Sequence, residues 1–272
     1  MSDVTRIGFV GAGMMAEAIA RGLLSARANP DALCASDPDE LRRAVFREMG
    51  IRCEADNRLI VGGCDVIILA VKPFLMADVI SDLADSVRPD QTIISIAAGI
   101  TTSAIEQALR SDAPVVRAMP NTPCLVGEGA IAIAPGRRAS HSHMDLAAGI
   151  LGASGKVVRV TEDRMDAVTG LSGSGPAYVY MFIEALTVGG VREGLSRDAA
   201  LSLAAQTVLG AAKMVIETGE HPAVLRDRVT TPAGTTIEGI ASLEDDEFRS
   251  AVMGAVSAAA QRSREIGKSS MR

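Results

Sequence analysis

Aromatic residues are scarce in this chain, at 3% of 272 residues, and tryptophan is absent. Hydrophobic residues nevertheless reach 48%, so the chain has ample material for a buried core. That core must be aliphatic and rich in alanine, which suits closely packed helices. The length favours one large domain or two ordinary ones.

A basic block is also missing, and the formal net charge is −6. This balance argues against nucleic acid and anionic membranes as partners, because both attract clustered Lys and Arg. The longest uncharged run, residues 167–183, contains the sequence Ser-Gly-Ser-Gly-Pro. We expect a loop inside that run, which makes it a poor membrane span.

The cysteine spacings that are typical of metal sites and of disulfide frameworks are absent as well. The cysteines are Cys34, Cys53, Cys64 and Cys124, with no C-x-x-C pair. No signal peptide precedes the first apolar run, so we expect free thiols and a cytoplasmic location. His141 and His143 have no Cys or Asp at ligand spacing, so we expect a solvated loop there and no metal site.

The first apolar run, residues 7–10, leads into Gly11-x-Gly13-x-x-Ala16 and then a helix-like pattern. The first glycine allows a tight turn, and the second lets backbone N–H groups approach a pyrophosphate. The helix that follows presents free N–H groups and a partial positive charge to that anion. The segment predicts dinucleotide binding; the alternative is a glycine-rich turn in another kind of α/β protein.

A second short strand, residues 33–36, ends at Asp37, which lies 21 residues after Ala16. A Rossmann fold places its ribose-binding carboxylate at about this distance. Asp37 could instead cap the polar helix that follows, and the two roles can coexist. An acid here repels a 2′-phosphate and favours NAD, whereas Arg42 and Arg43 could receive that phosphate.

Strand-like and helix-like segments then alternate along the first half of the chain. The expected strands are 65–71, 92–96, 114–119, 129–134 and 156–160, with helices near 74–87, 102–109 and 142–151. This order predicts a doubly wound parallel sheet with ligands at the carboxyl ends of the strands. The segments at those ends are 72–73, 97–99 and 120–123, and we expect them to line one cleft.

From Thr161 onward the strand signal disappears. We therefore expect an α/β fold in two domains: a Rossmann domain over residues 1–161 and an all-α domain over residues 162–272. The helix that starts after Ser196 is apolar or small nearly all round, so most of its surface must be buried. The second domain is too small to bury it alone, and we infer burial against a second subunit.

Several motifs together resemble the pyrroline-5-carboxylate reductase family, and the resemblance covers nearly the whole chain. Besides the glycine-rich start, the matching segments are 71–73, 97–101, 119–123, 171–178, 210–214, 221–222 and 227–237. The resemblance implies NAD(P)H-dependent reduction of 1-pyrroline-5-carboxylate to L-proline, the last step of proline biosynthesis. It also implies a helical dimerisation domain, hence a homodimer and in some members a larger ring of dimers. In the family, active sites lie between a Rossmann cleft and helices contributed partly by the partner chain.

The cofactor, NADPH or NADH, is expected at the glycine-rich turn and the strand ends. Asn57 is included because the resemblance implies a ribose contact, although a polar residue that opens a helix is often a cap. Lys72 could be a general acid, but its place before Pro73 suits a contact with cofactor ribose or phosphate better. The expected cofactor residues are Gly11, Gly13, Met14, Met15, Ser36, Asp37, Asn57, Val71, Lys72, Pro73, Ala97, Ala98, Gly99 and Asn121.

The substrate carboxylate needs a cradle of N–H groups. Residues 172–175 and 231–235 are small residues placed just before helices, where successive backbone N–H groups can hold an anion. The alternative is that both segments are capping turns. The resemblance assigns the second segment to the substrate. The expected substrate residues are Ser174, Val229, Thr231, Gly234, Thr235 and Thr236.

The proton that the ring nitrogen needs has no obvious donor, because no His or carboxylate stands out in these segments. The resemblance places the Thr236 hydroxyl near that nitrogen, where it can donate a hydrogen bond and relay a proton from water. The alternative for Thr236 is a helix N-cap or a first-turn threonine.

Three positions depart from the family pattern: Met14, Phe74 and Ala233. The family often has Asn or Gln at the first, Gln or His at the second, and Gly at the third. Glycine would permit a positive φ and a close approach of substrate, so Ala233 puts the fine shape of the substrate loop in doubt.

Two other classes of function stay open on sequence grounds. A 3-hydroxyacid dehydrogenase normally carries a catalytic Lys on the first long helix of its second domain, and residues 176–193 contain none. That argues against the dehydrogenase but not against a relaxed imine reductase. A non-catalytic nucleotide-sensing dimer would bind the cofactor and need neither substrate segment.

Overall fold

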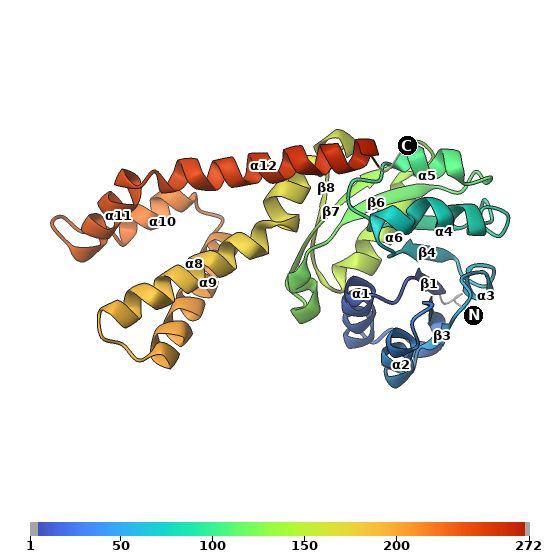
Figure 1. Cartoon of the computed structure of the whole chain (residues 1–272), viewed down its shortest axis with the longest axis horizontal. Coiled ribbons are helices and arrows are strands. Elements are labelled where there is room, and N and C mark those ends of the chain that lie inside the picture. Colours follow the sequence, from blue (N-terminus) through green and yellow to red (C-terminus); the bar gives the residue numbers. More distant parts are fainter. Residues whose placement is uncertain (1–4, 270–272) are drawn as a thin grey trace. The chain divides into compact units, whose positions relative to one another are not determined.

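The structure, a computed structural model, describes residues 5–269 (Figure 1). It forms two compact units. One contains the chain up to Ser174 together with the residues from Ser257 on, and the other contains Gly175 to Val256.

The first unit contains an eight-stranded sheet with the order β3-β2-β1-β4-β5-β6-β7-β8. Its strands are β1 (Ile7–Val10), β2 (Leu33–Ser36), β3 (Arg52–Glu54), β4 (Val66–Leu69), β5 (Thr92–Ser95), β6 (Val115–Met119), β7 (Gly129–Pro135) and β8 (Gly155–Arg159). The strand order reverses beside β1, since β2 pairs with one edge of β1 and β4 with the other. Such a switch point is where open α/β sheets bind ligands.

The expected Rossmann sheet is confirmed, with two strands of opposite direction. β7 runs antiparallel to β6 and β8 runs parallel to β7, while the neighbouring pairs that include β1, β4 and β5 are parallel. An apolar run looks the same in either direction, so the sequence pattern could not show this reversal. The short strand β3 was also not foreseen, because three residues carry too little alternation to be recognised.

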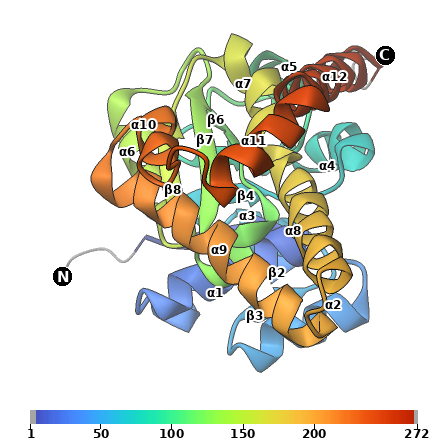
Figure 2. The ribbon, with the colours of Figure 1, turned by 90° about the vertical axis from the view of Figure 1, so that its left-hand side faces the viewer.

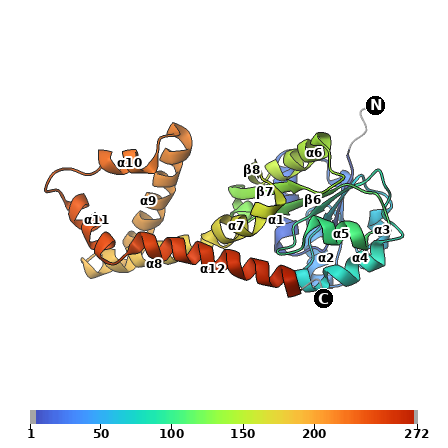
Figure 3. The ribbon, with the colours of Figure 1, turned by 90° about the horizontal axis from the view of Figure 1, so that it is seen from above.

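Helices cover both faces of the sheet. The helices of this unit are α1 (Met14–Ser25), α2 (Glu40–Glu48), α3 (Arg58–Val61), α4 (Met76–Leu83), α5 (Thr102–Ala108), α6 (His141–Gly152) and α7 (Met165–Val168). Figure 3 shows α6 on one side of the strands and α4 and α5 on the other. The consecutive residues Ile67 and Ile68 are both fully buried and belong to opposite core clusters. A strand buried on both faces explains why its sequence is continuously apolar.

Residues 165–192 are almost continuously helical, which differs from the expected loop at 172–175. α7 continues through a π-helical turn (Thr169–Gly173) into α8 (Gly175–Arg192). The Ser174 N–H donates to the Thr169 carbonyl over 2.9 Å. The expected cradle of free N–H groups is therefore wrong at Ser174.

The second unit is helical. Its elements are α8, α9 (Arg197–Thr218), α10 (Pro222–Arg228), α11 (Thr235–Asp245) and the first part of α12 (Phe248–Ser269). α8 and α9 form a hairpin (Figure 2), packed closely where a Cβ at Gly190 would lie 3.2 Å from the Ala200 side chain. α10 was not foreseen: the His221 side chain caps it by accepting from the Ala223 N–H over 3.2 Å.

α9 is the one described helix long and apolar enough to cross a membrane by length and composition alone. Within its own unit it buries only Ala200 and Ala204, so a wide apolar surface is left uncovered there.

Candidate cofactor site and substrate loop

A cleft of about 870 Å³ lies at the carboxyl ends of the central strands of the first unit. Most of the expected cofactor residues line it: Gly11, Gly13, Met14, Met15, Ser36, Asp37, Asn57, Val71, Lys72, Pro73, Ala97 and Ala98. Thr122, from the segment 120–123 that was expected at the cleft, also lines it, and lining residues that the sequence did not single out are Ala55, Leu75, Asp78, Val79 and Leu125. Asp78 and Val79 lie on a helix pattern that gave no sign of facing a ligand.

The glycine-rich turn has the geometry that an anion needs. Gly11 has φ +94°, and a Cβ there would lie 2.9 Å from the Ala70 carbonyl oxygen, so only glycine fits. Gly13 is the N-cap of α1 and provides no side-chain cap, which leaves first-turn N–H groups for a ligand. An uncapped helix start beside an open cleft fits the pyrophosphate of a dinucleotide.

Asp37 ties the end of β2 to this turn. Its Oδ2 accepts a hydrogen bond from the Ala12 N–H over 2.8 Å, and its Oδ1 accepts one from the Asp39 N–H over 2.9 Å. The N-cap of α2 is Asp39, whose carboxylate accepts from the Leu41 N–H. The capping role considered for Asp37 thus belongs to Asp39, and Asp37 is left facing the cleft.

Arg42 lines the same cleft. Its guanidinium donates to the Ala12 carbonyl and to Glu17 Oε2, each over 2.7 Å. Burial raises the pKa of Glu17, but hydrogen bonds from Arg42 and Arg21 outweigh this and hold that pKa below its usual range. Arg43 donates to the carbonyls of Asp37 and Pro38 instead and does not line the cleft.

Ser36 and Asn57 form a hydrogen-bonded pair in the wall of the cleft. The buried Ser36 hydroxyl donates to Asn57 Oδ1 over 2.8 Å. Asn57 opens α3 but makes no side-chain cap bond, so its capping alternative is not realised. The bond from Ser36 fixes the amide with its nitrogen free to donate.

Lys72 follows β4 at the cleft edge and is exposed. Within residues 5–269 it forms no ion pair, so its ammonium is available to an anionic ligand. Its backbone conformation is extended, as expected for a residue before proline.

Gly99 and Asn121 do not line the cleft. A Cβ on Gly99 would lie 3.2 Å from the backbone nitrogen of Gly267, so Gly99 faces α12. The buried Asn121 amide donates to the Ser172 carbonyl over 3.0 Å and accepts from the Ala130 N–H over 2.9 Å. In this structure Gly99 thus packs against α12 and Asn121 links two backbone segments, while their expected cofactor contacts stay a prediction.

The substrate segment of the second unit is a tight turn followed by a helix. The Gly234 N–H donates to the Thr231 carbonyl over 3.0 Å, and Ala233 has φ +54°. A proline at the second position of the turn, here Pro232, and a positive φ at the third position are typical of a type II turn. Ala233 therefore adopts the left-handed conformation for which the family's glycine is suited.

α11 begins directly after this turn without a side-chain cap, because its N-cap is Gly234. Thr235 and Thr236 occupy its first turn. Val229 is 64% exposed, and Thr231 is exposed too. The Thr236 hydroxyl makes no hydrogen bond with any other described residue. Uncapped N–H groups and three nearby hydroxyls can bind a carboxylate.

Among residues 5–269, no group of three or more His, Cys, Asp and Glu side chains could hold a metal ion. His141 and His143 lie at the start of α6 rather than in a loop, and the Ser140 N–H donates to His143 Nδ1 over 3.0 Å.

Comparisons with known proteins cover both halves of the chain. Residues 162–266 match the family model for pyrroline-5-carboxylate reductase dimerisation. Residues 6–99 match a model described as NADP oxidoreductase, coenzyme F420-dependent.

Relatives match over nearly the full length. A pyrroline-5-carboxylate reductase of Methanosarcina acetivorans is 49% identical, over 97% of this chain and 98% of the relative. A solved pyrroline-5-carboxylate reductase from Coxiella burnetii superposes with a TM-score of 0.91 at 37% identity, covering 97% of this chain and 99% of that one. The Plasmodium falciparum pyrroline carboxylate reductase with NADP bound gives 0.88 at 32% identity, with 98% and 99% covered. With these matches and the motifs above, the chain belongs to the pyrroline-5-carboxylate reductase family.

Proposed function

We propose that this protein reduces 1-pyrroline-5-carboxylate to L-proline with NADPH or NADH, as the last step of proline biosynthesis. The observation that carries the proposal is the uncapped start of α11 after the Thr231–Gly234 turn, in a chain that also has a dinucleotide cleft. A nucleotide sensor would need the cleft alone.

The cleft binds the cofactor through three kinds of group. The first-turn N–H groups of α1 hold the pyrophosphate, and the Lys72 ammonium adds a positive charge at the cleft edge. Asp37 and Asn57 present a carboxylate and an amide to ribose hydroxyls. When bound, the nicotinamide supplies the hydride that the imine carbon accepts.

The substrate carboxylate binds at the start of α11. There the uncapped N–H groups of Thr235 and Thr236 combine with the positive end of the helix dipole. The Thr231 hydroxyl lies close to Gly234. A Cβ on residue 234 would lie only 2.2 Å from Thr231 Oγ1, so only glycine permits this arrangement. Val229 supplies an exposed apolar surface for the ring methylenes.

The Thr236 hydroxyl holds the ring nitrogen. A hydroxyl is a poor acid at neutral pH, but it can donate a hydrogen bond to the nitrogen and pass on a proton from water. Its lack of a partner among the described residues leaves it available for this role.

We propose a homodimer in the cytoplasm, with a larger ring of dimers as the further assembly to be tested. The match of residues 162–266 to a dimerisation model supports the dimer, as does the wide apolar surface of α9.

The test mixes purified protein with pyrroline-5-carboxylate and either NADPH or NADH, and follows the loss of reduced cofactor by absorbance and the formation of proline by chromatography. Oxidation that depends on pyrroline-5-carboxylate supports the proposal. No oxidation with either cofactor, although both bind, would leave the nucleotide-sensing function. Faster oxidation with a different cyclic imine would favour a relaxed imine reductase. The dehydrogenase alternative is disfavoured because α8 contains no Lys.

A further inference from the structure

Two cysteine thiols meet at the amino ends of the strands, which is the end of the sheet away from the cofactor cleft. Cys34 Sγ on β2 lies 3.3 Å from Cys64 Sγ, in the segment just before β4. β2 and β4 flank β1 on opposite sides, so the thiols come together across the central strand. Gly8 of β1 allows this, because a Cβ there would lie only 2.9 Å from Cys64 Sγ.

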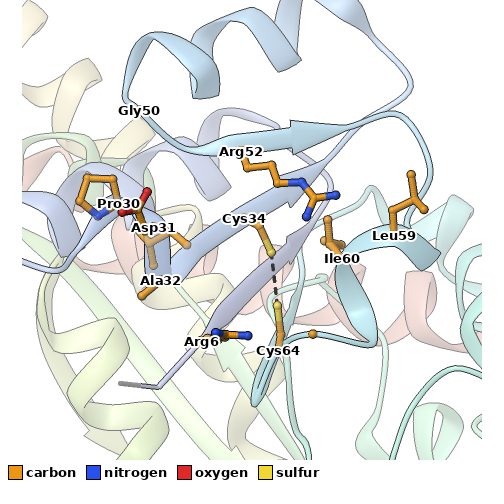
Figure 4. A pocket seen from close by; sticks show the side chains of 12 residues that line it. Arg6, Pro30, Asp31, Ala32, Cys34, Gly50, Arg52, Leu59, Ile60 and Cys64 are labelled. Carbon is orange, nitrogen blue, oxygen red and sulfur yellow. Dashed lines mark hydrogen bonds between the residues drawn. The ribbon is translucent and has the colours of Figure 1, made fainter. Parts of the chain in front are cut away.

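The pair opens into a pocket of about 280 Å³ (Figure 4). Its walls come from residues at the amino ends of β1, β2 and β3, including Arg6, Asp31 and Arg52, and from Ile60 of α3. The cofactor cleft lies at the carboxyl ends of these strands, so the pocket is a separate site. Cys64 itself is 2% exposed, and Cys34 is half-buried, so the pocket reaches Cys34 more readily.

The surroundings favour a thiolate on Cys34. A hydrogen bond from the Cys64 thiol lowers the pKa of Cys34 most; burial opposes it, and the charges of Arg52 and Arg6 add to the lowering. The same contact and burial raise the pKa of Cys64. Cys53 is the contrast: burial, with the charge of Asp37, raises the pKa of its thiol to about 11.

We propose that Cys34 and Cys64 are a reversible oxidation site that forms a disulfide when a hydroperoxide enters this pocket. One thiolate that is reachable and one neighbouring thiol to resolve it are what such a site requires. The two sulfurs are already 3.3 Å apart, so bond formation requires them to approach by about 1.3 Å.

The disulfide would form in two steps. The Cys34 thiolate attacks the terminal oxygen of hydrogen peroxide, the O–O bond breaks, hydroxide leaves, and Cys34 becomes a sulfenic acid. The Cys64 sulfur then attacks Cys34 Sγ, the S–O bond breaks, and the Cys64 proton leaves with the hydroxyl as water. Two thiols are oxidised by two electrons in total, and one peroxide is reduced to two waters.

The experiment treats the full-length folded protein with hydrogen peroxide, blocks remaining thiols with iodoacetamide, and analyses tryptic peptides by mass spectrometry. Each cysteine falls on its own peptide: 28–42 for Cys34, 53–58 for Cys53, 59–110 for Cys64 and 118–137 for Cys124. We expect the linked pair 28–42 with 59–110, which dithiothreitol separates. We also expect iodoacetamide to label Cys34 at least tenfold faster than Cys53 before oxidation.

Variants make the test specific. In Cys64→Ser the resolving thiol is gone, so a sulfenic acid should persist on Cys34 and be trapped by dimedone; Cys64→Ala replaces this variant if the serine protein does not fold. Cys53→Ser is the matched control and should still form the linked pair. Recovery of both thiols in reduced form after peroxide treatment, or a disulfide that joins other cysteines, would overturn the proposal.

Discussion

Asp37 acts on the cofactor site through both of its oxygens. One oxygen holds the Ala12 N–H in the glycine-rich turn and the other holds the Asp39 N–H, so the carboxylate is fixed at the cleft wall. Arg42 lies in the same wall with its charge paired to Glu17. We expect the preference between NADH and NADPH to follow from the balance of these two charges, because a 2′-phosphate is repelled by the first and attracted by the second.

Replacing the acid tests that balance. In Asp37→Ser we expect the ratio of kcat/KM for NADPH to that for NADH to rise about tenfold, which corresponds to roughly 1.4 kcal/mol. Steady-state kinetics with both cofactors measure this ratio. Asp39→Ser is the control: it removes a neighbouring carboxylate that does not line the cleft, so its ratio should stay at the wild-type value. A wild-type ratio in Asp37→Ser would remove this residue from cofactor selection.

Thr236 is the residue that we propose holds the ring nitrogen of the substrate. We expect Thr236→Ala to lower kcat more than tenfold while the dissociation constant for NADPH, measured by fluorescence titration, is unchanged. The variant lacks the hydroxyl that would donate a hydrogen bond to the ring nitrogen of the substrate while hydride is transferred, so the rate of that step should fall. Thr230→Ala is the matched control, since the Thr230 hydroxyl donates to the Arg226 carbonyl. Wild-type turnover in Thr236→Ala would exclude Thr236 from the mechanism.

Asn121 has a structural role that its sequence motif did not reveal. Its side chain bonds Ser172 and Ala130, and truncation leaves both backbone partners unsatisfied. At about 1 kcal/mol for each bond, we expect Asn121→Ala to lower the free energy of unfolding by about 2 kcal/mol. Denaturant unfolding measures this loss, and calorimetric titration should give an NADPH affinity within twofold of the wild type. A large loss of affinity with full stability would restore Asn121 to the cofactor site.

These residues show what can be predicted from local chemistry. Gly11 and Gly13 were predicted because a tight turn that approaches a phosphate requires glycine at particular positions. Those positions are close together in the sequence, so the motif can be recognised locally. The role of Asn121 depends on Ser172, which is 51 residues away, and no spacing rule connects them. The contact of Cys34 with Cys64 across Gly8 escaped prediction for the same reason.

Elements were predicted where one face or both faces of a segment are buried over several residues. β1 and β4 have continuous apolar sequences because helices cover both sides of the sheet, and this pattern is independent of distant partners. The direction of β7, the π-helical turn at Thr169–Gly173 and the short helix α10 depend on particular hydrogen bonds instead. Such bonds involve few residues and leave no periodic signal.

One contact between elements involves a buried charge on β6. Glu162 accepts from both the backbone N–H and the hydroxyl of Thr102, each over 2.6 Å, and lies 3.6 Å from the guanidinium of Arg117. Arg117 on β6 has a side chain that is only 5% exposed, so without Glu162 its charge would be buried unpaired.

We therefore expect Glu162→Ala to lower the free energy of unfolding by about 3 kcal/mol, because removing one partner of a buried pair leaves the other charge buried without a counter-charge. Urea unfolding followed by circular dichroism measures the change. Asp163→Ala is the control: its partner Arg164 is exposed, and exposed pairs contribute little. Equal losses in the two variants would show that the buried pair adds nothing of its own.

At the scale of the whole molecule, the second unit exposes more apolar surface than a protein in water normally leaves uncovered. Within that unit Leu209 is 58% exposed and Ile216 is 80% exposed. Leu201, at 51%, precedes Leu209 by eight residues, and Ile216 follows it by seven, so the three lie along one face of α9. A stripe of this kind in a dimerisation domain is explained by a second copy of the chain.

A charge placed in the middle of this stripe should separate the subunits. Burying a carboxylate in an apolar interface without a partner costs several kcal/mol, so we expect Leu209→Glu to weaken the dimer by at least a hundredfold. Sedimentation velocity over a dilution series gives the dissociation constant, and circular dichroism verifies that the helices remain folded. Thr207→Glu adds the same charge to α9 at an exposed polar position two residues before Leu209, which places it on the opposite face, and it should leave the dimer intact. If Leu209→Glu stays as tightly associated as Thr207→Glu while folded, the subunits meet through a different face of the helical unit.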